Sequence, residues 1–408
     1  MTTPQTDPTR STGREGPLVG IVVADFTQLV QGPFASQILA DLGAEVVKIE
    51  PPAGDWLRRF ALGNNYPGGQ SISFLAFNRN KQSIVLNLKR QAHLEAARRI
   101  VAAADVVLEN FRPGVMERLG LGYDSLRVLN PRLVYCASSG YGPDGPYRSR
   151  PGQDLLVQAV TGLPTLNGRE ADPPIPVGIG IADVAAGLHM VYGTLAALVE
   201  RNRTGLGQRV DVNLLNSLLA LQSQELTAHL NTDQRPRRNP DMAGTPYTGA
   251  PYGIYRTSDG YLAIAMNPVN RLATTLGLAG FEEIAEQNVT EPGAGRRIRQ
   301  AIAARLAEAD TTTWLELLLK DDIWCAPVND YDMVVADPQV LHNQMIIEFD
   351  HPAAGPVRAI GPAIRFGNQA AAEPGPPPRL GVDGHDILVN LAGYSPAEAE
   401  LLLRTQDA

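Results

Sequence analysis

The sequence predicts an α/β protein whose main domain is built on a parallel β-sheet. Short, almost continuously apolar runs alternate with stretches of helical periodicity. Strands that are apolar along their whole length are typical of parallel sheets, because helices cover both faces of such a sheet. Strand–helix–strand units join by right-handed crossovers, so we expect helices on both faces.

The alternation begins close to the N-terminus. An apolar run over 19–25 is followed by a helix over 34–42, which Gly43 ends, and by a second run over 45–50 before two prolines. The pattern continues with apolar runs over 83–88, 105–110 and 132–138, a helix over 91–103 and a short helix after Pro113. Ligands bind beyond the carboxyl ends of the strands in such sheets. The residues expected there are 27–33, Glu50, Lys89, 110–112 and 139–142.

The remaining chain predicts further helices and a second domain. A helix over 183–203 precedes a short strand over 210–214 and a helix over 214–229. Beyond a polar linker, a hairpin turning at 258–260 and helices over 269–277, 295–307 and 311–320 indicate a small α+β domain. Short strands and proline-rich turns then lead to a closing helix over 396–404.

These elements predict a chain of several segments. We expect a polar leader over 1–15, the N-terminal part of a large Rossmann-like domain over 16–210, a helical linker over 211–245, a small α+β domain over 246–325, and a return segment with the C-terminal part of the large domain over 326–408. The leader has no apolar core of the kind found in signal peptides.

Composition argues against several functional classes. The chain has 408 residues, 44% of them hydrophobic, and a formal net charge of −8. We therefore expect a soluble protein that binds neither nucleic acid nor a membrane surface, since both need a basic face. Cys136 and Cys325 lie far apart and the histidines have no metal-binding spacing, so we expect neither a disulfide framework nor a metal site. A reducing cytoplasm fits this cysteine usage.

Three common signatures are absent from the sequence. No G-x-G-x-x-G follows the first strand, no G-x-x-x-x-G-K-[ST] occurs, and no G-x-S-x-G is present. The sequence therefore lacks the motifs that would indicate dinucleotide binding, a P-loop nucleotide site or a serine hydrolase.

Asp183 is the candidate nucleophile. It opens the helix over 183–203, where the helix dipole and free N–H groups favour an ionised carboxylate. Gly178, Gly180 and Gly187 would let a substrate approach the main chain. The ordinary alternative is that Asp183 only caps the helix. Other carboxylates that could assist, each with an ordinary explanation as a cap, a turn or a solvated residue, are Asp154, Asp172 and Glu225.

A local excess of basic residues lies between Arg79 and Arg118 in this acidic chain. Lys89, Arg112 and Arg118 fall at or just after strand ends, where they could hold phosphates. The pattern indicates a phosphorylated ligand without naming it.

Several motifs extend over nearly the whole chain from Gly16. They are V-V-A-D-F-T-x-x-x-x-G-P, L-A-D-L-G-A-E-V-V-K-I-E-P-P, N-R-N-K-Q-S-I-V-L-N-L-K, A-D-V-V-L-E-N-F-R-P-G-V-M-E-R-L-G-L-G-Y, S-G-Y-G-P-D-G-P-Y, R-P-G-Q-D-L-L-V-Q-A-V-T-G, V-G-I-G-I-A-D-V-A-A-G, R-T-G-L-G-Q-R-V-D-V and C-A-P-V-N. Together they resemble the class III CoA-transferases, the CaiB/BaiF family, whose relatives include formyl-CoA, carnitine and succinyl-CoA:glutarate CoA-transferases and α-methylacyl-CoA racemases. The segment over 337–366 looks especially like the succinyl-CoA:glutarate branch.

The resemblance implies an interlocked homodimer of ring-like subunits and places the family's catalytic aspartate at Asp183. It implies that coenzyme A or acyl-CoA is bound as a substrate, without a metal, by Val30, Gln31, Leu86, Asn87, Lys89, Asn110, Phe111, Arg112, Arg118, Ser139, Gly140 and Tyr141. The implied reaction moves CoA from an acyl-CoA to a carboxylic acid, dicarboxylic acids among them, through an aspartyl anhydride and an aspartyl-CoA thioester. With an ordinary pKa near ~3.9, the nucleophile needs no general base.

Three departures from the family pattern bear on the reaction. Gln153 stands where the racemase branch has a histidine, and an amide cannot exchange an α-proton. The G-G-G-G-Q loop of the formyl-CoA branch has no counterpart, and L-G-V-D-G-H-D-I-L replaces the usual L-G-E-H-T. A racemase and a non-catalytic CoA-binding protein remain the alternatives to a transferase.

Overall fold

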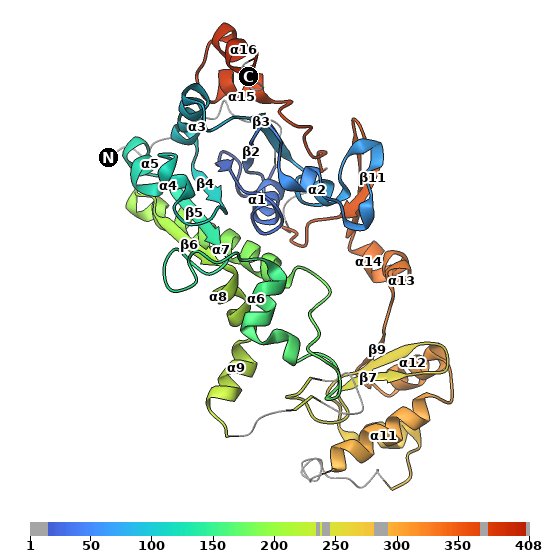
Figure 1. Ribbon diagram of the computed structural model, residues 1–408. Coiled ribbons are helices and arrows are strands. Elements are labelled where there is room, and N and C mark those ends of the chain that lie inside the picture. The colour runs from blue at the N-terminus through green and yellow to red at the C-terminus, as the bar shows by residue number, and fades with distance from the viewer. Residues whose placement is uncertain (1–14, 234–236, 239–244, 281–292, 368–373, 405–408) are drawn as a thin grey trace. The chain divides into compact units, whose positions relative to one another are not determined.

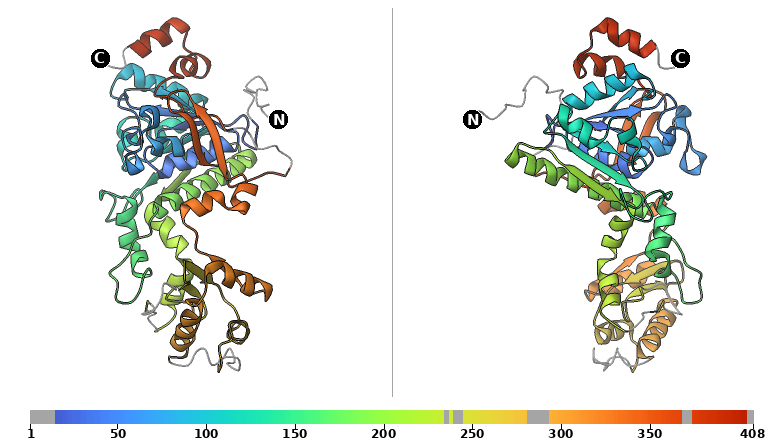
Figure 2. Two further views of the ribbon diagram at one scale, coloured as in Figure 1. Left: turned by 90° about the vertical axis from the view of Figure 1, so that its right-hand side faces the viewer. Right: turned by 60° about the vertical axis from the view of Figure 1, so that its left-hand side comes forward.

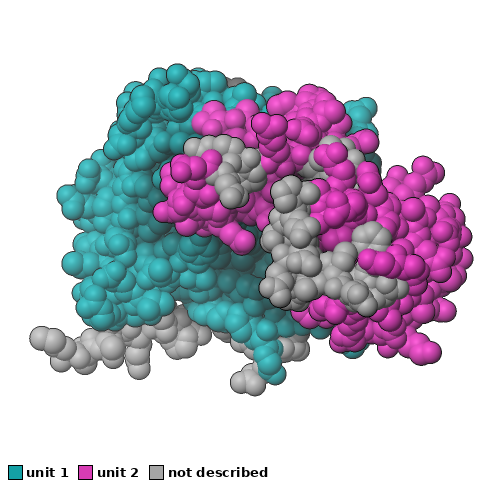
Figure 3. Space-filling model, turned by 90° about the horizontal axis from the view of Figure 1, so that it is seen from below, with its two compact units in different colours: residues 1–157, 180–221, 339–408 teal, residues 158–179, 222–338 magenta. Residues whose placement is uncertain are grey.

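The computed structural model describes residues 15–233, 237–238, 245–280, 293–367 and 374–404 (Figure 1). The chain divides into two compact units (Figure 3). Unit 1 comprises residues 1–157, 180–221 and 339–408, and unit 2 comprises 158–179 and 222–338. Residues 158–179, which we expected in the large domain, cluster with unit 2, and the expected linker over 211–245 is divided between the units. The leader over 1–15 lies outside the described residues except for Glu15.

Unit 1 is built on the expected parallel sheet. Its strands are β1 (Val22–Asp25), β2 (Glu45–Glu50), β3 (Lys81–Val85), β4 (Val106–Glu109), β5 (Val134–Ser139) and β6 (Arg209–Asn213). They lie in the order β3-β2-β1-β4-β5-β6, and every neighbouring pair is parallel. Val23 of β1 pairs with Val46 on one side and Val106 on the other. The order reverses between β1 and β4, which is where ligands bind in doubly wound sheets.

Helices from both ends of the chain cover one face of this sheet. α3 (Gln91–Ala103), α4 (Val115–Arg118), α5 (Tyr123–Leu129), α15 (Gly384–Asn390) and α16 (Pro396–Arg404) bury their apolar residues with Val22, Ala24 and Val47. Figures 1 and 2 show α15 and α16 beside α3. The C-terminal helices α15 and α16 therefore share one hydrophobic core with strands and helices from the N-terminal part of the chain.

The opposite face is covered by α1 (Gln31–Asp41) and α7 (Ile181–Thr204), which pack on each other. α7 also contacts β5, β6 and α8 (Leu214–Leu221). It ends at Gly205, whose φ of 78° is the left-handed conformation typical of a helix C-cap. α7 is long and apolar enough to cross a membrane, but half of its most apolar stretch is buried, as in the core helix of a globular protein.

Smaller elements complete unit 1. α2 (Ile72–Phe77) follows three short 3-10 turns and packs through Leu75 on a hairpin formed by β10 (Ile346–His351) and β11 (Gly355–Ile360). α6 (Asp154–Thr161) and α14 (Pro338–His342) lie at the unit boundaries. The expected single helix over 214–229 is wrong: α8 ends at Leu221 and α9 (Ser223–Leu230) begins after the buried Gln222.

Unit 2 is an antiparallel sheet covered by helices. Its strands are β7 (Gly253–Arg256), β8 (Tyr261–Ile264) and β9 (Cys325–Pro327). Its core is formed with α10 (Val269–Leu276), α11 (Ala294–Leu306) and α12 (Thr311–Lys320), each within one residue of its expected bounds. α13 (Tyr331–Ala336) follows β9 along the chain.

Candidate active site

The carboxyl edge of the unit 1 sheet opens at the point where the strand order reverses. The loop from β1 to α1, residues 26–30, and the segment after β4 lie side by side there, because Asn110 bridges them. Its Oδ1 accepts the N–H of Gln28 at 2.9 Å, and its Nδ2 donates to the Gln28 carbonyl at 2.8 Å. The structure therefore places side by side two segments that sequence analysis assigned to CoA.

Other residues implied to bind CoA line the same edge. Asn87 and Lys89 follow β3, Phe111 and Arg112 follow β4, and Ser139 ends β5. Lys89, Arg112 and Arg118 have exposed side chains and form no ion pair among the described residues. Leu86 is different, since its side chain is 1% exposed in the core, so only its main chain is available to a ligand.

The Gln31 and Tyr141 side chains are held by neighbours on this edge. Gln31 is buried and its Oε1 accepts the Ser138 hydroxyl at 2.7 Å. The Tyr141 ring packs edge-on against Tyr147 with 5.4 Å between centroids. Gly140 lies so close to Gly152 that neither position has room for a Cβ atom. The loop after β5 is thus fixed by packing as well as by the strand.

Arg148 is a basic residue that sequence analysis missed. A Cβ atom at Gly114 would lie 3.2 Å from Nη1 of Arg118 and 3.4 Å from Nη2 of Arg148, so two guanidinium groups converge there. Arg148 donates to the Pro143 carbonyl at 2.7 Å, and neither arginine pairs with a carboxylate in the part of the chain that the structure describes. Guanidinium pairs of this kind suit phosphate. The available signal was R-S-R directly after the S-G-Y-G-P-D-G-P-Y motif.

Several charges near this edge belong instead to what we call the buried ion cluster. Its members are Asp25, Lys48, Glu50, Asp55, Arg58 and Lys81. Glu50, which we expected at the ligand edge, is paired with Arg58 at 2.7 Å. Lys81 belongs to this cluster, and Arg79 is paired with Asp41 at 2.5 Å. Part of the basic excess read from the sequence is therefore structural.

Asp183 lies in the first turn of α7 but does not cap it. Gly180 occupies the N-cap position and Asp183 is the third helical residue, so the simple capping interpretation is wrong. Asp154 supplies the capping oxygen: its Oδ1 accepts the N–H of Ala182 at 2.6 Å. This contact brings a second carboxylate to the start of the helix that carries Asp183.

The pKa of Asp183 differs from the sequence-based expectation. Burial, and to a lesser extent the charge of Asp154, raise it from 3.8 to about 7. No cation contributes to this shift. The expectation of an ordinary, fully ionised aspartate at neutral pH is therefore wrong, because burial and the charge of Asp154 both favour the protonated form.

Gly187 sets how closely α7 approaches α1. A Cβ atom there would lie 2.8 Å from the Gln31 carbonyl oxygen and 2.8 Å from the ring of Phe34. The glycine therefore serves helix packing rather than substrate access, contrary to our expectation. Since Asp183 and Gly187 are one turn apart, both lie on the side of α7 that faces the start of α1.

The other candidate carboxylates have local partners or lie in unit 2. Asp172 accepts the N–H of Arg169 at 2.7 Å in a turn, and Glu225 lies in the first turn of α9.

The His189 ring contacts the Ala185 carbonyl at 2.8 Å and packs on Tyr192. Within the described ranges, no group of three or more histidine, cysteine or acidic side chains is placed to hold a metal ion.

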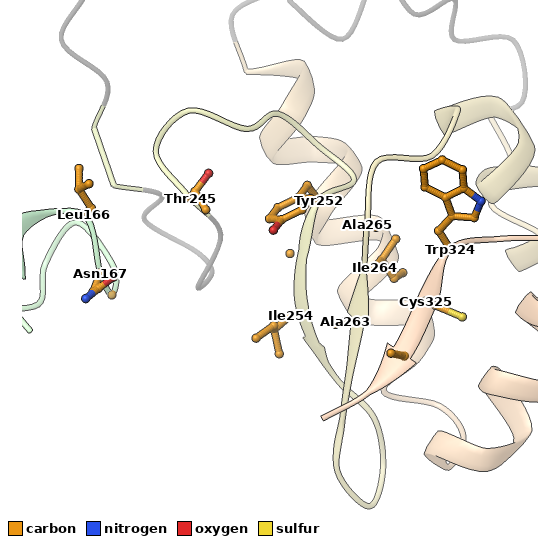
Figure 4. A pocket seen from close by; sticks show the side chains of 13 residues that line it. Leu166, Asn167, Thr245, Tyr252, Ile254, Ala263, Ile264, Ala265, Trp324 and Cys325 are labelled. Carbon is orange, nitrogen blue, oxygen red and sulfur yellow. The ribbon is translucent and has the colours of Figure 1, made fainter. Parts of the chain in front are cut away.

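Unit 2 contains a separate, mostly apolar cavity of about 610 Å³ (Figure 4). Its walls include Ile254 and Ala263 from the sheet, Trp324 just before β9, and Leu166 from the segment opposite. Cys325 also lines it, and burial raises the pKa of this thiol, which disfavours the thiolate. Its described lining residues include no carboxylate, in contrast to the start of α7, which carries Asp183.

Comparison with known proteins gives a consistent assignment. Residues 18–384 match the model of CoA-transferase family III. The chain is 34% identical over 393 residues to a mouse (Mus musculus) protein named succinyl-CoA:glutarate CoA-transferase, covering 95% of this chain and 89% of the relative. It is 32% identical over 404 residues to a formyl-CoA:oxalate CoA-transferase of Streptomyces avermitilis, covering 94% and 98%.

A solved structure agrees with these sequence relatives. The crystal structure of a CaiB/BaiF family protein from Brucella suis aligns with a TM-score of 0.81 and 31% identity, covering 93% of this chain and all of that one. The resemblance read from the motifs is therefore confirmed. The chain belongs to CoA-transferase family III, and it is an enzyme of the CoA-transferase type.

Proposed function

We propose that this enzyme transfers CoA from an acyl-CoA to a free carboxylic acid, with Asp183 as the nucleophile. The observation that carries the proposal is the place of Asp183. It is a half-buried carboxyl group that has no cation partner among the described residues, on the helix that packs against the start of α1. A carboxylate that is poorly solvated and unpaired is a stronger nucleophile than one held in an ion pair.

The chemistry proceeds without a net proton transfer. An ionised Asp183 oxygen attacks the thioester carbonyl, the C–S bond breaks, and a mixed anhydride and CoA thiolate form. The thiolate then attacks the Asp183 carbonyl of the anhydride, giving an aspartyl-CoA thioester and releasing the first acid. The acceptor carboxylate attacks that thioester, and the thiolate finally takes the new acyl group. Asp183 is regenerated as a carboxylate.

CoA would bind along the carboxyl edge of the sheet. The exposed cations Lys89, Arg112, Arg118 and Arg148 would hold its phosphates, as free guanidinium and ammonium groups do. The loop 26–30 and Gln31 would bring the thioester end toward α7. This assignment adds Arg148 to the residues that the family resemblance implied.

The names of the relatives support a proposal for the substrates, and the family resemblance supports one for the assembly. A dicarboxylic acid is the acceptor we expect, since the mouse relative is named for succinyl-CoA and glutarate. We also propose an interlocked homodimer in the cytoplasm, on the resemblance stated above. Racemisation is disfavoured because Gln153 cannot exchange an α-proton.

The test is covalent trapping. Wild-type enzyme, Asp183→Ala and Asp154→Asn are incubated with succinyl-CoA and other acyl-CoAs, treated with borohydride or hydroxylamine, and analysed by intact mass and peptide mapping. We expect an adduct on Asp183 in the wild type and in Asp154→Asn, and none in Asp183→Ala. An adduct on another carboxylate would move the nucleophile.

Two further outcomes separate the alternatives. Tight CoA binding without any adduct would favour a binding protein, and exchange of the substrate's α-proton for deuterium without an acceptor would favour a racemase. For the phosphate site, Arg148→Gln should weaken CoA binding about tenfold, whereas Arg132→Gln, an exposed arginine that contacts the Gly205 carbonyl, should not.

A further inference from the structure

The loop 26–30 has a backbone conformation that its amino acids do not favour by themselves. Leu29 has a φ of 67°, in the left-handed region that residues other than glycine, asparagine and aspartate rarely adopt. Its side chain is exposed, so core packing does not explain the conformation. Something else must hold this loop in place.

Side chains from three different segments hold three consecutive residues of the loop. Lys48 Nζ donates to the Thr27 carbonyl at 2.8 Å, and Asn110 makes two hydrogen bonds with Gln28. Asp55 Oδ1 accepts the N–H of Leu29 at 3.2 Å. The conformation of the loop is therefore imposed by β2, by the segment after β2 and by the segment after β4.

Two of these anchors, Lys48 and Asp55, are one buried ion pair. Lys48 Nζ lies 2.9 Å from Asp55 Oδ2, and both side chains are 0% exposed. Burial lowers the pKa of Lys48, but the carboxylates of Asp55, Asp25 and Glu50 more than offset this, so the pKa is raised and Lys48 stays charged. Asp55 Oδ1 also accepts the N–H of Leu57 at 2.9 Å, which fixes the carboxylate in orientation.

A buried ion pair is a poor way to gain stability. The cost of removing both charges from water is large, and apolar side chains of similar volume often serve a core as well or better. What an apolar pair cannot do is donate to the Thr27 carbonyl and accept from Leu29. The specific contribution of this pair is therefore the geometry of the loop.

The loop is continuous with the start of α1. Gln31, which follows it, is fixed by Ser138, and the Gln31 carbonyl lies against α7 at Gly187, one turn from Asp183. A loop that moved would displace both the expected CoA contacts at Val30 and Gln31 and the surface on which the nucleophile's helix rests.

We propose that Lys48 and Asp55 are positioning residues that hold the loop 26–30 in its CoA-binding conformation. The proposal rests on the proposed function, because it assumes that this edge of the sheet binds CoA. Neither residue contacts the substrate; both act through the main chain of Thr27 and Leu29.

The test compares two double variants in which both charges are gone. Lys48→Met/Asp55→Leu removes both anchors of the pair, while Lys48→Met/Asp55→Asn keeps an oxygen that can accept the N–H of Leu29. The matched control is Arg79→Met/Asp41→Leu, which removes a buried ion pair at the other end of α1. Double variants are used because a single one would leave a buried charge unpaired.

Three quantities are measured on each protein: thermal unfolding, hydrogen exchange of the amides over 26–31, and CoA affinity by calorimetry. We expect Lys48→Met/Asp55→Leu to exchange at least about tenfold faster over 27–29 and to bind CoA about tenfold more weakly, because the ligand must then order the loop. Lys48→Met/Asp55→Asn should be intermediate. The control should match the wild type in both readouts, whatever its melting temperature.

The outcomes distinguish the two proposals. Wild-type exchange and CoA affinity in Lys48→Met/Asp55→Leu would overturn the positioning role. Equal losses in that variant and in the control would also overturn it, since they would reflect stability alone. If wild-type enzyme bound no CoA, the proposed function would fail, and the exchange rates would still decide whether the pair holds the loop.

Discussion

Asp25 in the buried ion cluster and Asp183 at the start of α7 are both carboxyl groups removed from water, yet their pKa values move in opposite directions. Burial raises the pKa of Asp25, but Lys48, Lys81 and the hydroxyls of Ser36 and Thr27 outweigh it, and the pKa is lowered. At Asp183 burial acts together with the charge of Asp154, and the pKa rises to about 7. The presence of a cation, rather than the depth of burial, decides whether a buried carboxyl group is a structural anion or a reactive one.

The two regions therefore have different roles: the buried ion cluster is structural, and the start of α7 carries the proposed nucleophile. In the buried ion cluster, the paired charges of Lys48 and Asp55 shape the main chain. At the start of α7, Asp183 forms no ion pair within the described part of the chain, and its burial has a cost in stability that reactive sites commonly carry.

The largest effect is expected from Asp183→Asn. Transfer activity should fall by about ten-thousand-fold or more, because the nucleophile is lost. Stability should rise, because a carboxyl group whose folded pKa lies above its unfolded value is most stabilising when protonated and loses that contribution as pH rises from about 4 through 7. At pH 8 the gain should be on the order of 2 kcal/mol, after a discount for partial exposure. Urea unfolding at pH 8 and at pH 4 checks this, and an equal difference at both would contradict it.

Next in size is the loss of a lysine from the buried ion cluster. Lys48→Met should cost about 3–5 kcal/mol, since it leaves Asp55 without its cation. Lys81→Met should cost less, about 1–2 kcal/mol, because burial already lowers the pKa of Lys81 to about 7 and half of the molecules carry a neutral amine at that pH. Denaturant unfolding at pH 7.5 measures both. Equal losses in the free energy of unfolding would contradict this prediction, since they would show that Lys48 and Lys81 carry the same charge in the folded protein.

A smaller effect on stability and activity is expected from a substitution at Gly187, where α7 packs on the start of α1. Gly187→Ala would place a methyl group against the Gln31 carbonyl and Phe34, and should destabilise the protein by about 1–3 kcal/mol and lower kcat. Gly193→Ala on the same helix would meet Cγ1 of Val210 alone, at 2.9 Å, and its gain in helix propensity partly offsets that contact, so it should cost less than Gly187→Ala. Activity unchanged in Gly187→Ala would show that the spacing of α1 and α7 does not matter to Asp183.

The smallest effect is expected from Asp154→Asn, which removes the second negative charge near the start of α7 and changes the pKa of Asp183. In wild-type enzyme, kcat/KM should rise with pH through about 7, since Asp183 must be ionised to attack. Asp154→Asn keeps an oxygen for the N–H of Ala182 but removes the negative charge, so the midpoint should move to lower pH by up to about one unit. The pH profile of the two proteins measures this. A midpoint that did not move would mean that burial alone sets the pKa of Asp183.

Much of the fold and the candidate nucleophile could be predicted from the sequence alone. Continuous apolar strands separated by helices predicted the parallel sheet, since only a sheet covered on both faces needs such strands. The strand ends located the ligand edge, the placement of Asp183 at the start of a helix made it the candidate nucleophile, and the motifs gave the family. These features depend on local pattern, which a single sequence carries.

Other features were decided only by the tertiary structure. Glu50 was expected at the ligand edge and Lys81 lay in the basic excess, but Glu50 pairs with Arg58 and Lys81 with Asp25 inside the protein. The sequence also did not single out Arg148, whose guanidinium lies close to that of Arg118 near Gly114. The ionisation of Asp183 depends on burial and on Asp154, which precedes it by a whole connecting segment. Burial and charge pairing arise from residues distant in sequence, so no local pattern could have fixed them.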